Sequence, residues 1–474
     1  MSKEIQEKEI EVETENQKFS NKTIAAICGI ALLSDGYVNN SVGSVTSILK
    51  RQYPAEAKTA KAFTYITSWT YLGTIFGMLA FGTIADVFGR KAGMISANLL
   101  LILFTLGCAV SFSPNGTPEG LFWMLVVFRT LLGVAIGAEY PTGSVAASES
   151  TQTSGGAGQS IFVLVTSCAC DSGFVLSAFV TYIFASIFGE GRLELIWRLT
   201  IGFGIIIPTS ILWFRVQIHE EKGEKEIKIP YTLIFKKYWP NLFACSAIWF
   251  LYDIVCYPVA NYASVITEAV LPANAPLADA YFWETITFLF YIPGAIGGAY
   301  LTPNTVLGPR NTLILGFFLQ AVCGCILYFW YVDISKSVGV FTIFFGLFLS
   351  FGELGPGDSV YLISSSSCPS SVRGRFFGIA SAVGKVGAYV GSQYFRDIQK
   401  WFGNGDETSI DGKRGFFLFA AGINVIGILI AFFLIANFSE TIVEEEDEAF
   451  KKYIIEEGYT LEEFGLEEKK KIDL

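Results

Sequence analysis

The chain has 474 residues, of which 52% are hydrophobic and only 16% are charged, whereas charged residues make up about a quarter of a typical soluble domain. With a mean hydropathy of +0.48, this composition excludes a disordered or collagen-like chain and argues against a soluble enzyme. The formal net charge of −10 lies in the two ends, because residues 1–22 sum to −2, residues 439–474 sum to −8 and the rest sum to zero. Acidic ends on a neutral body do not favour nucleic acid as a partner.

The first 22 residues are charged and lack an apolar core. No cleavable signal peptide is therefore visible, and we expect the first apolar segment to act as an uncleaved anchor. The nine cysteines lie mostly inside apolar runs, and His219 is the only histidine. This pattern predicts no disulfide framework, no metal site and no cofactor.

Twelve stretches are long and apolar enough for bilayer-spanning helices, each of which needs roughly 20 residues. They lie near residues 23–47, 62–85, 93–112, 121–142, 158–187, 195–217, 239–265, 281–302, 312–332, 338–364, 374–397 and 415–437. The 47 glycines suit close helix packing in lipid. The sequence therefore predicts an all-α membrane protein with twelve transmembrane helices.

The longest hydrophilic stretch of the body, 218–238, divides the predicted helices into two halves, 23–217 and 239–438. Weak repeats at an offset near 218 relate the halves. They are Asp35 with Asp253, `GAEYP` (137–141) with `GPGDS` (355–359), `SGGAGQSIF` (154–162) with `VRGRFFGIA` (372–380), and `GTIADVFGRKAG` (82–93) with `GAYLTPNTVLGPRN` (298–311). Their common order favours duplication of a six-helix unit and predicts two pseudo-symmetric bundles.

With both tails, 1–22 and 439–474, in the cytosol, the inside loops hold eleven basic residues and the outside loops nine. This is a weak positive-inside bias, and the sequon at Asn115 falls in an outside loop. The acidic tails are expected to be solvated and mobile. Alternatively, they are a handle for trafficking or ubiquitination machinery through Lys451, Lys452 or Lys469–Lys471.

A charge at the centre of a bilayer helix costs about 2.5–3.5 kcal/mol and therefore faces a cavity or a partner. The predicted helices contain Asp35, Arg129, Glu139, Asp171, Asp253, Glu284, Glu353, Asp358 and Lys385. In the fourth span, Arg129 could pair with Asp35 or Glu139 in a proton relay, or form a purely structural pair.

The seventh span carries a polar stripe, since Trp249, Asp253, Tyr257 and Asn261 recur every four residues. Their indole, carboxyl, phenol and amide groups suit a polar ligand, although a polar seam between helices would show the same pattern. In the eleventh span, Lys385 has glycines close on either side. Its ammonium would attract an anion or form a salt bridge with Asp253, and the two roles are compatible.

The segment after the second span carries Gly82, Asp86, Gly89, Arg90 and Lys91. Its charges are expected at the membrane surface, where they would act in gating or stability and not in substrate binding. These five residues resemble the loop signature of the major facilitator superfamily, and the resemblance extends over all twelve predicted helices.

Further motifs resemble the phosphate:proton symporter branch of that superfamily. They are `RTLLGVAIGAEYP` (129–141), the stripe of the seventh span and `GKVGA` (384–388). `SDGYVNNSVG` (34–43) is similar to fungal glycerophosphoinositol, or glycerophosphodiester, permeases. The resemblance implies phosphate contacts from Tyr140, Trp249, Asp253, Tyr257 and Lys385, and proton transfer by Asp35 and Glu139.

Two positions depart from the phosphate symporters. The family's glutamine in the fifth span falls near Thr166 and Ser167, and its asparagine in the tenth span falls on Gly357. A glycine would leave volume beside the anion for an alcohol esterified to the phosphate, although close helix packing would also explain Gly357. We therefore expect Gly357, Ser167 and Asn261 to shape a headgroup pocket.

The sequence favours a proton-coupled importer of glycerophosphodiesters, such as glycerophosphoinositol or glycerophosphocholine, in the plasma membrane. The close alternative is an inorganic phosphate:proton symporter, and an alternative of another class is a nutrient-sensing receptor that signals through its acidic tail. An integral membrane enzyme is disfavoured, because the sequence offers no Ser/His/Asp set and no metal cluster.

Overall fold

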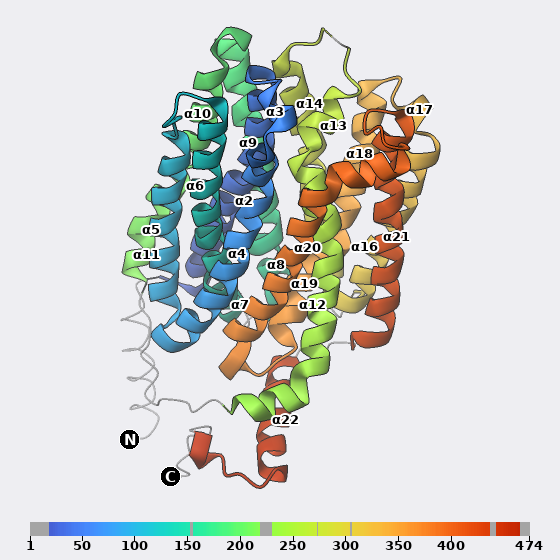
Figure 1. Ribbon diagram of the computed structural model, residues 1–474. Coiled ribbons are helices and arrows are strands. Elements are labelled where there is room, and N and C mark those ends of the chain that lie inside the picture. The colour runs from blue at the N-terminus through green and yellow to red at the C-terminus, as the bar shows by residue number, and fades with distance from the viewer. Residues whose placement is uncertain are drawn as a thin grey trace.

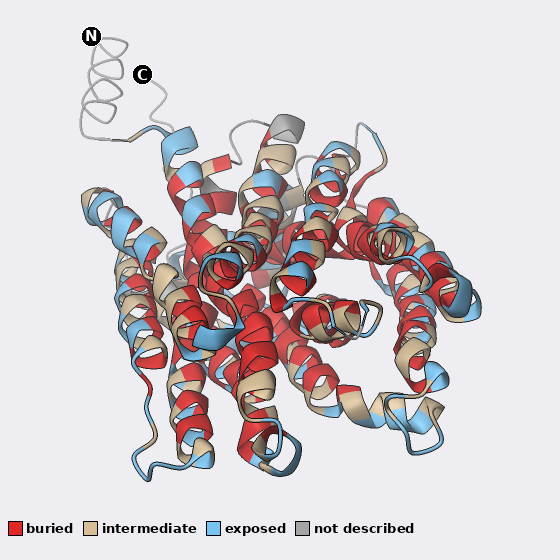
Figure 2. Ribbon diagram, turned by 90° about the horizontal axis from the view of Figure 1, so that it is seen from above, coloured by how far each residue is buried: buried red, intermediate tan, exposed pale blue. Residues whose placement is uncertain are grey.

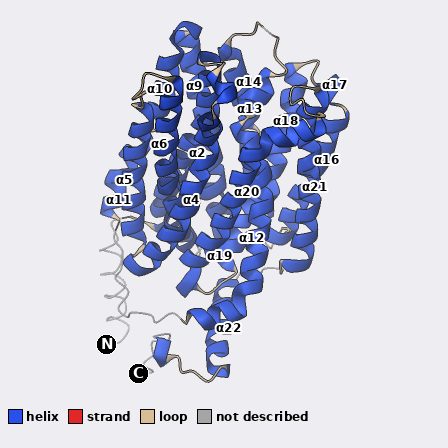
Figure 3. Ribbon diagram, in the orientation of Figure 1, coloured by secondary structure: helices blue, strands red, loops and turns tan. Residues whose placement is uncertain are grey.

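The computed structural model describes residues 19–151, 155–218, 230–272, 274–303, 306–436 and 442–464. Within these ranges the protein is built from helices without strands (Figure 3). Twelve helical spans are formed by the described residues and stand side by side in one bundle (Figure 1), which confirms the predicted fold class.

The first six spans comprise ten α-helices and the segments that interrupt or join them. They are α2 (Asn21–Gln52), α3 (Glu56–Thr59), α4 (Lys61–Phe88), α5 (Arg90–Ala109), α6 (Pro118–Glu139), η1 (Tyr140–Ser144), α7 (Val145–Thr151), α8 (Gly155–Val163), η3 (Leu164–Cys168), α9 (Ala169–Phe188), η4 (Glu190–Arg192), α10 (Leu193–Phe203) and α11 (Ile206–Gln217). The fourth span joins α6, η1 and α7, the fifth joins α8, η3 and α9, and the sixth joins α10 and α11.

The elements of the second half form the last six spans and, after them, a helix outside the bundle. They are α12 (Tyr231–Asn261), α13 (Ala263–Glu268), α14 (Leu277–Leu289), α15 (Tyr291–Leu301), α16 (Pro309–Phe329), α17 (Tyr331–Ile334), α18 (Val338–Gly352), η5 (Glu353–Gly357), α19 (Asp358–Ser366), η6 (Ser370–Val372), α20 (Arg373–Phe402), α21 (Ile410–Leu434), α22 (Ile442–Glu456) and η7 (Glu462–Phe464). Because α12 already begins at Tyr231, the predicted boundary between 238 and 239 falls inside a helix.

Judged by length and composition only, eight of the described spans are long and apolar enough to cross a membrane. The other four are α2, α4, α14 with α15, and α20, of which α2 and α20 bury several polar side chains. All four lie at the seam between the halves, where α4 packs against α20, α14 against α9 and α12 against α2. Figure 2 shows buried residues gathered in the middle of the bundle. Because the polar side chains of α2 and α20 are among the buried ones, these helices do not face lipid with their polar sides.

Two equivalent turns support the predicted duplication. Gly89 precedes α5 with φ 91° and ψ 161°, and Gly308 precedes α16 with φ 86° and ψ 158°. This region of backbone space favours glycine because it lacks a Cβ atom. The same turn therefore starts the third span and the ninth span, 219 residues apart.

Part of the acidic C-terminal segment is packed against the body. In α22, Phe450 and Ile454 are buried, and Lys237 Nζ donates a hydrogen bond to the carbonyl oxygen of Ala449 at 2.6 Å. The expectation of a freely solvated tail is wrong for residues 442–464, because this helix has an apolar side to bury. Lys452 remains exposed, whereas residues 1–18, His219 and Lys469–Lys471 lie outside the described residues.

Candidate functional site

Three π-helical turns interrupt the spans around the centre of the bundle. They are η1 at Tyr140–Ser144, η3 at Leu164–Cys168 and η5 at Glu353–Gly357. Pro141 and Pro356 lie in two of them and cannot donate the backbone hydrogen bond of a regular α-helix. Such turns are frequent at functional sites, and here they present Tyr140, Ser167 and Glu353 to the interior.

A buried ion pair joins the two helices whose polar residues suggested an anion site. The Nζ atom of Lys385 lies 2.9 Å from Oδ2 of Asp253 and donates to the hydroxyl of Tyr257 at 2.6 Å. The hydroxyl of Tyr257 lies 3.1 Å from that of Tyr140, on the other half of the bundle. Both ionic side chains are buried, with exposures of 2% and 1%. The anticipated salt bridge is thus confirmed, and four of the five expected phosphate contacts meet at the seam.

The fifth contact, Trp249, lies one helical turn from Asp253. Its ring centroid is 5.1 Å from that of Tyr361, which stacks on Tyr140 at 6.0 Å. A Cβ atom added to Gly384 would lie 2.4 Å from Cδ1 of Trp249. The glycine beside Lys385 therefore admits the indole ring and leaves no empty space there. Tyr361 escaped sequence analysis because no helical pattern distinguishes it within `SVYLISSSS`.

The central cavity measures about 20 Å³, roughly the room needed for one water molecule. Its wall consists of Ser167, Cys170, Asp171, Phe174, Trp249, Tyr252, Asp253, Cys256, Tyr257, Glu353 and Tyr361. These residues come from both halves, so a larger ligand requires the halves to separate.

One wall of this cavity is acidic. Glu353 accepts a hydrogen bond from the hydroxyl of Tyr252, and a Cβ atom on Gly357 would lie 2.0 Å from Oε2 of Glu353. The volume expected to be free beside Gly357 is therefore filled by Glu353 and Tyr252. Ser167 Oγ donates to the Gly357 carbonyl at 3.3 Å, and Asp171 Oδ2 has no hydrogen-bond partner among the described residues.

Glu353, Asp171 and Tyr252 are site residues that sequence reasoning did not select. Glu353 and Asp171 do belong to the short set of charges expected inside the membrane. Membership of that set was the signal that could have identified them as site residues. The counterpart of Glu353 in the other half is Glu139. A Cβ atom added to Gly143 would lie 2.1 Å from Oε1 of Glu139, just as one added to Gly357 would lie 2.0 Å from Oε2 of Glu353. In both halves a carboxyl covers a glycine four residues later, beside a π-helical turn. This local correspondence has an offset of 214 residues and not 218.

Glu139 is bound by Arg215 and not by Arg129. The Nη1 atom of Arg215 donates to Oε2 of Glu139 at 2.8 Å, and Nη2 bonds the other carboxyl oxygen. The proposed pairing of Arg129 is wrong, since its Nε and Nη1 donate to Thr70 Oγ1 and the Val38 carbonyl. Ten residues of α-helix place Arg129 about 15 Å from Glu139 along the axis, whereas the end of α11 brings Arg215 to the level of Glu139.

Asp35 lies within electrostatic reach of Glu139 and Arg215. Its Oδ2 atom has no hydrogen-bond partner among the residues described. These three side chains form a second buried charged group, which contains both residues expected to transfer protons.

Asn261 is separated from the other two predicted headgroup residues. Its Nδ2 atom donates to the hydroxyl of Tyr71 at 2.6 Å and lies 3.3 Å from Ser392 Oγ. Ser167 and Gly357 bond each other instead. The predicted trio is therefore divided, and Asn261 helps to close the site at the end of α12.

The segment assigned to gating lies where the halves touch. A Cβ atom on Gly82 would lie 3.0 Å from the carbonyl oxygen of Gly374 at the start of α20. Gly89 forms the turn described above, and Arg90 and Lys91 begin α5. Asp86 belongs to α4, but its side chain is outside the described part. Gating by this segment stays a prediction.

Comparison with known proteins matches residues 28–392 to the family model of the Major Facilitator Superfamily. A major glycerophosphoinositol permease and a glycerophosphocholine permease, both of Candida albicans, are each 38% identical over 446 residues, covering 92% of this chain and 82% of the relative. The solved structure of the proton:xylose symporter XylE bound to 6-bromo-6-deoxy-D-glucose superimposes with a TM-score of 0.75. It is 16% identical and covers 90% of this chain and 98% of that one, so this likeness concerns the fold.

Proposed function

We propose that this chain, which belongs to the major facilitator superfamily and is therefore a membrane transporter and not an enzyme, imports glycerophosphodiesters together with protons. The observation that carries the proposal is the buried Lys385 ammonium between Asp253, Tyr257 and Tyr140, at the seam of the halves. Two relatives with different named headgroups are equally similar, so glycerophosphoinositol and glycerophosphocholine both stay candidates.

The phosphate group would bind by taking the place of Asp253 as the partner of Lys385. The hydroxyl groups of Tyr140 and Tyr257 and the indole N–H of Trp249 would orient it. When Asp253 carries a proton it can donate a hydrogen bond to the phosphate, whereas the ionised carboxylate would repel it. Arrival of the anion therefore requires opening of the ion pair.

Proton coupling is supported by the charges around this site. An entering monoanion would meet the carboxyl groups of Asp253, Glu353 and Asp171 around one ammonium group. Moving a monoanion towards a negative interior costs about 2.3 kcal/mol per 100 mV, and two accompanying protons would reverse that sign. Asp35 and Glu139 would exchange protons in the second charged group, with Arg215 as their counter-charge.

Transport would proceed by rocking of the two halves about this site. The α4–α20 and α9–α14 contacts are the surfaces that would separate in turn. Because the chain crosses the membrane twelve times, which is an even number, the start of α2 and the end of α21 lie on the same side. We assign this side to the cytosol of a plasma-membrane protein, and it would also hold α22 and the segment from Gly82 to Lys91.

The direct test is uptake of radiolabelled glycerophosphoinositol by cells that express the chain. Lys385→Ala and Asp253→Asn should each abolish uptake, whereas Lys336→Ala, a change at an exposed lysine, should not. Full uptake by both site variants would refute the assignment.

Two alternatives give different results in the same assay. Free phosphate as the main substrate predicts strong competition by unlabelled phosphate at a concentration equal to that of the diester. A receptor that signals with little transport predicts negligible uptake by the unaltered chain. Normal uptake after deletion of residues 445–474 would leave transport as the primary role.

A further inference from the structure

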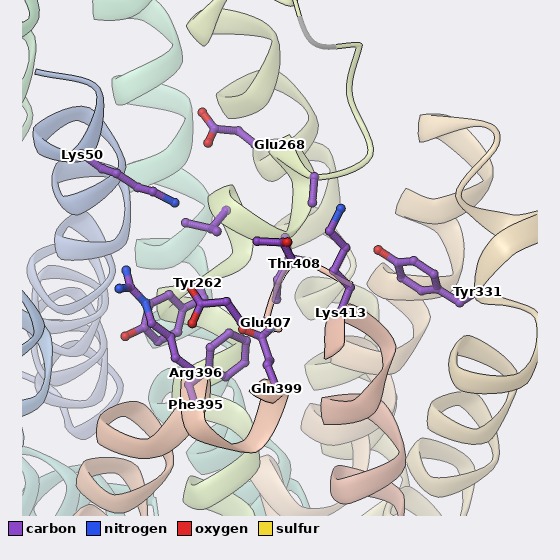
Figure 4. A pocket seen from close by; sticks show the side chains of 13 residues that line it. Lys50, Tyr262, Glu268, Tyr331, Phe395, Arg396, Gln399, Glu407, Thr408 and Lys413 are labelled. Carbon is purple, nitrogen blue, oxygen red and sulfur yellow. The ribbon is translucent and has the colours of Figure 1, made fainter. Parts of the chain in front are cut away.

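A larger cavity lies at the end of the bundle opposite α22. It measures about 280 Å³ and is enclosed by the ends of α2, α12 and α20, the start of α21, and the short helices α13 and α17 (Figure 4). Pockets that bind small molecules begin near 300 Å³. This cavity therefore has room for part of a polar metabolite, unlike the closed central site.

Three basic side chains line this outer cavity from three different elements. Figure 4 shows Lys50 of α2, Arg396 of α20 and Lys413 of α21 around the same space. None of the three makes a salt bridge with a residue that the structure describes. Lys50 is within electrostatic reach of Arg396, which repels it, and of Glu268 and Glu407, which attract it. A shared anion would relieve this repulsion.

The two acidic residues of the cavity have other basic partners. Glu268 accepts hydrogen bonds from Arg51 at 3.2 and 3.0 Å. Glu407 lies 3.7 Å from Nζ of Lys400. Neither partner lines the cavity. Arg51 and Lys400 are also paired with Glu190 and Asp397. The excess of positive charge offered to an entering anion is therefore that of three basic over two acidic side chains in the lining.

The floor of the outer cavity is the layer that closes the central site. The rings of Tyr262 and Phe395 stack at 4.4 Å, and the hydroxyl of Tyr262 donates to the carbonyl oxygen of Ser392. Ser392 Oγ is in turn a partner of Asn261. One aromatic and polar layer thus separates the two cavities.

One helix face connects the two groups of positive charge. Ser392 and Arg396 follow Lys385 by seven and eleven residues on α20. This spacing places all three on the same side of an α-helix. Arg396 stands about 16 Å above Lys385 along the axis, with the closing layer between them. An anion released from the outer cavity would meet Lys385 once that layer opens.

We propose that the outer cavity is a docking site for the phosphate group of the anionic substrate, occupied before the layer at Asn261 and Ser392 opens. The proposal rests on the proposed function, because it requires import of a phosphate ester from this side. Lys50, Arg396 and Lys413 bind the anion there, and the central Lys385 receives it in a second step.

The test compares Arg396→Gln with Arg396→Lys and with Lys336→Gln, a change at an exposed lysine of the same end of the bundle. Uptake of radiolabelled glycerophosphoinositol is measured over a range of substrate and salt concentrations. At low substrate concentration, Arg396→Gln should reduce uptake about fivefold, and high substrate should overcome the loss. Added salt should lower uptake less in this variant than in the unaltered chain. Arg396→Lys keeps the charge and should retain more uptake at low substrate concentration, and more salt dependence, than Arg396→Gln. Lys336→Gln should behave like the unaltered chain.

Binding to purified full-length protein separates the outer site from the transport proposal. In a Lys385→Met/Asp253→Asn background, which leaves neither buried charge of the pair, the protein should retain weak, salt-sensitive binding of glycerophosphoinositol, and adding Arg396→Gln should remove it. An unchanged concentration dependence in Arg396→Gln, or equal binding with and without Arg396, would overturn the outer site. Absence of any diester uptake by the unaltered chain would instead overturn the proposed function.

Discussion

The ion pair between Lys385 and Asp253 should show strong non-additivity in a double-mutant cycle. At 2.9 Å between Nζ and Oδ2, and with an effective dielectric constant of 20, the attraction is about 6 kcal/mol. Removing two charges from water costs several kcal/mol for each ion, so the intact pair contributes little net stability. Breaking one side leaves a buried charge, and we expect Lys385→Met to cost about 3–5 kcal/mol. Adding Asp253→Asn should recover most of this loss.

The assay is thermal unfolding of the four purified proteins in detergent, together with uptake by cells. Stability should fall in Lys385→Met and return in the double variant, whereas uptake should stay absent in both. The exposed pair of Lys336 with Asp333 is the matched control, and Lys336→Met should cost less than about 1 kcal/mol. Additive losses, with the double variant less stable than either single variant, would refute the reasoning.

Three further predictions concern the acidic wall and the docked helix. Glu353→Gln should abolish the stimulation of uptake by external acid while exchange of labelled for unlabelled diester persists, and retained acid stimulation would exclude Glu353 from proton coupling. Gly357→Ala should destabilise the protein by about 1–3 kcal/mol in thermal unfolding, since its Cβ atom would displace the Glu353 carboxyl; an unchanged midpoint would contradict this packing. A hydrogen bond from Lys236 lowers the pKa of the exposed Glu457. Because this stabilisation is present above the carboxyl's ordinary pKa and lost as pH falls through the lowered value, the protection of α22 amides against hydrogen exchange should decrease in acid, when measured relative to the intrinsic exchange rate at each pH. The same protection should decrease at neutral pH in Glu457→Gln.

The helices and half of the site follow from local rules of sequence. Length and hydropathy locate the spans, and a four-residue spacing places Trp249, Asp253 and Tyr257 on one face because α12 continues through all of them without a π-helical turn. The attraction of opposite charges in lipid then suggests Lys385 as the partner of Asp253. These inferences need only helix geometry and the cost of burying a charge.

The remaining site residues depend on how separate helices are aligned. Arg215 lies 76 residues from Glu139, and nothing in their local patterns fixes the relative height of α6 and α11. The surroundings of Gly357 depend on a π-helical turn, which regular helical periodicity does not anticipate. The docking of α22 likewise depends on a tertiary contact, because its acidic composition alone favours a solvated tail.

The π-helical turns have a consequence for how the spans that contain them are built. Each turn holds an extra residue, so deleting one residue would restore an ordinary helix and rotate the following part by about 100°. In the fourth span, α6 and α7 on the two sides of η1 are therefore set independently against their neighbours. Moving the turn by one residue would rotate the side chains next to the substrate while the far end of the helix kept its contacts. The spans that present Tyr140, Ser167 and Glu353 thus contain their own means of local adjustment, in addition to rocking of the halves.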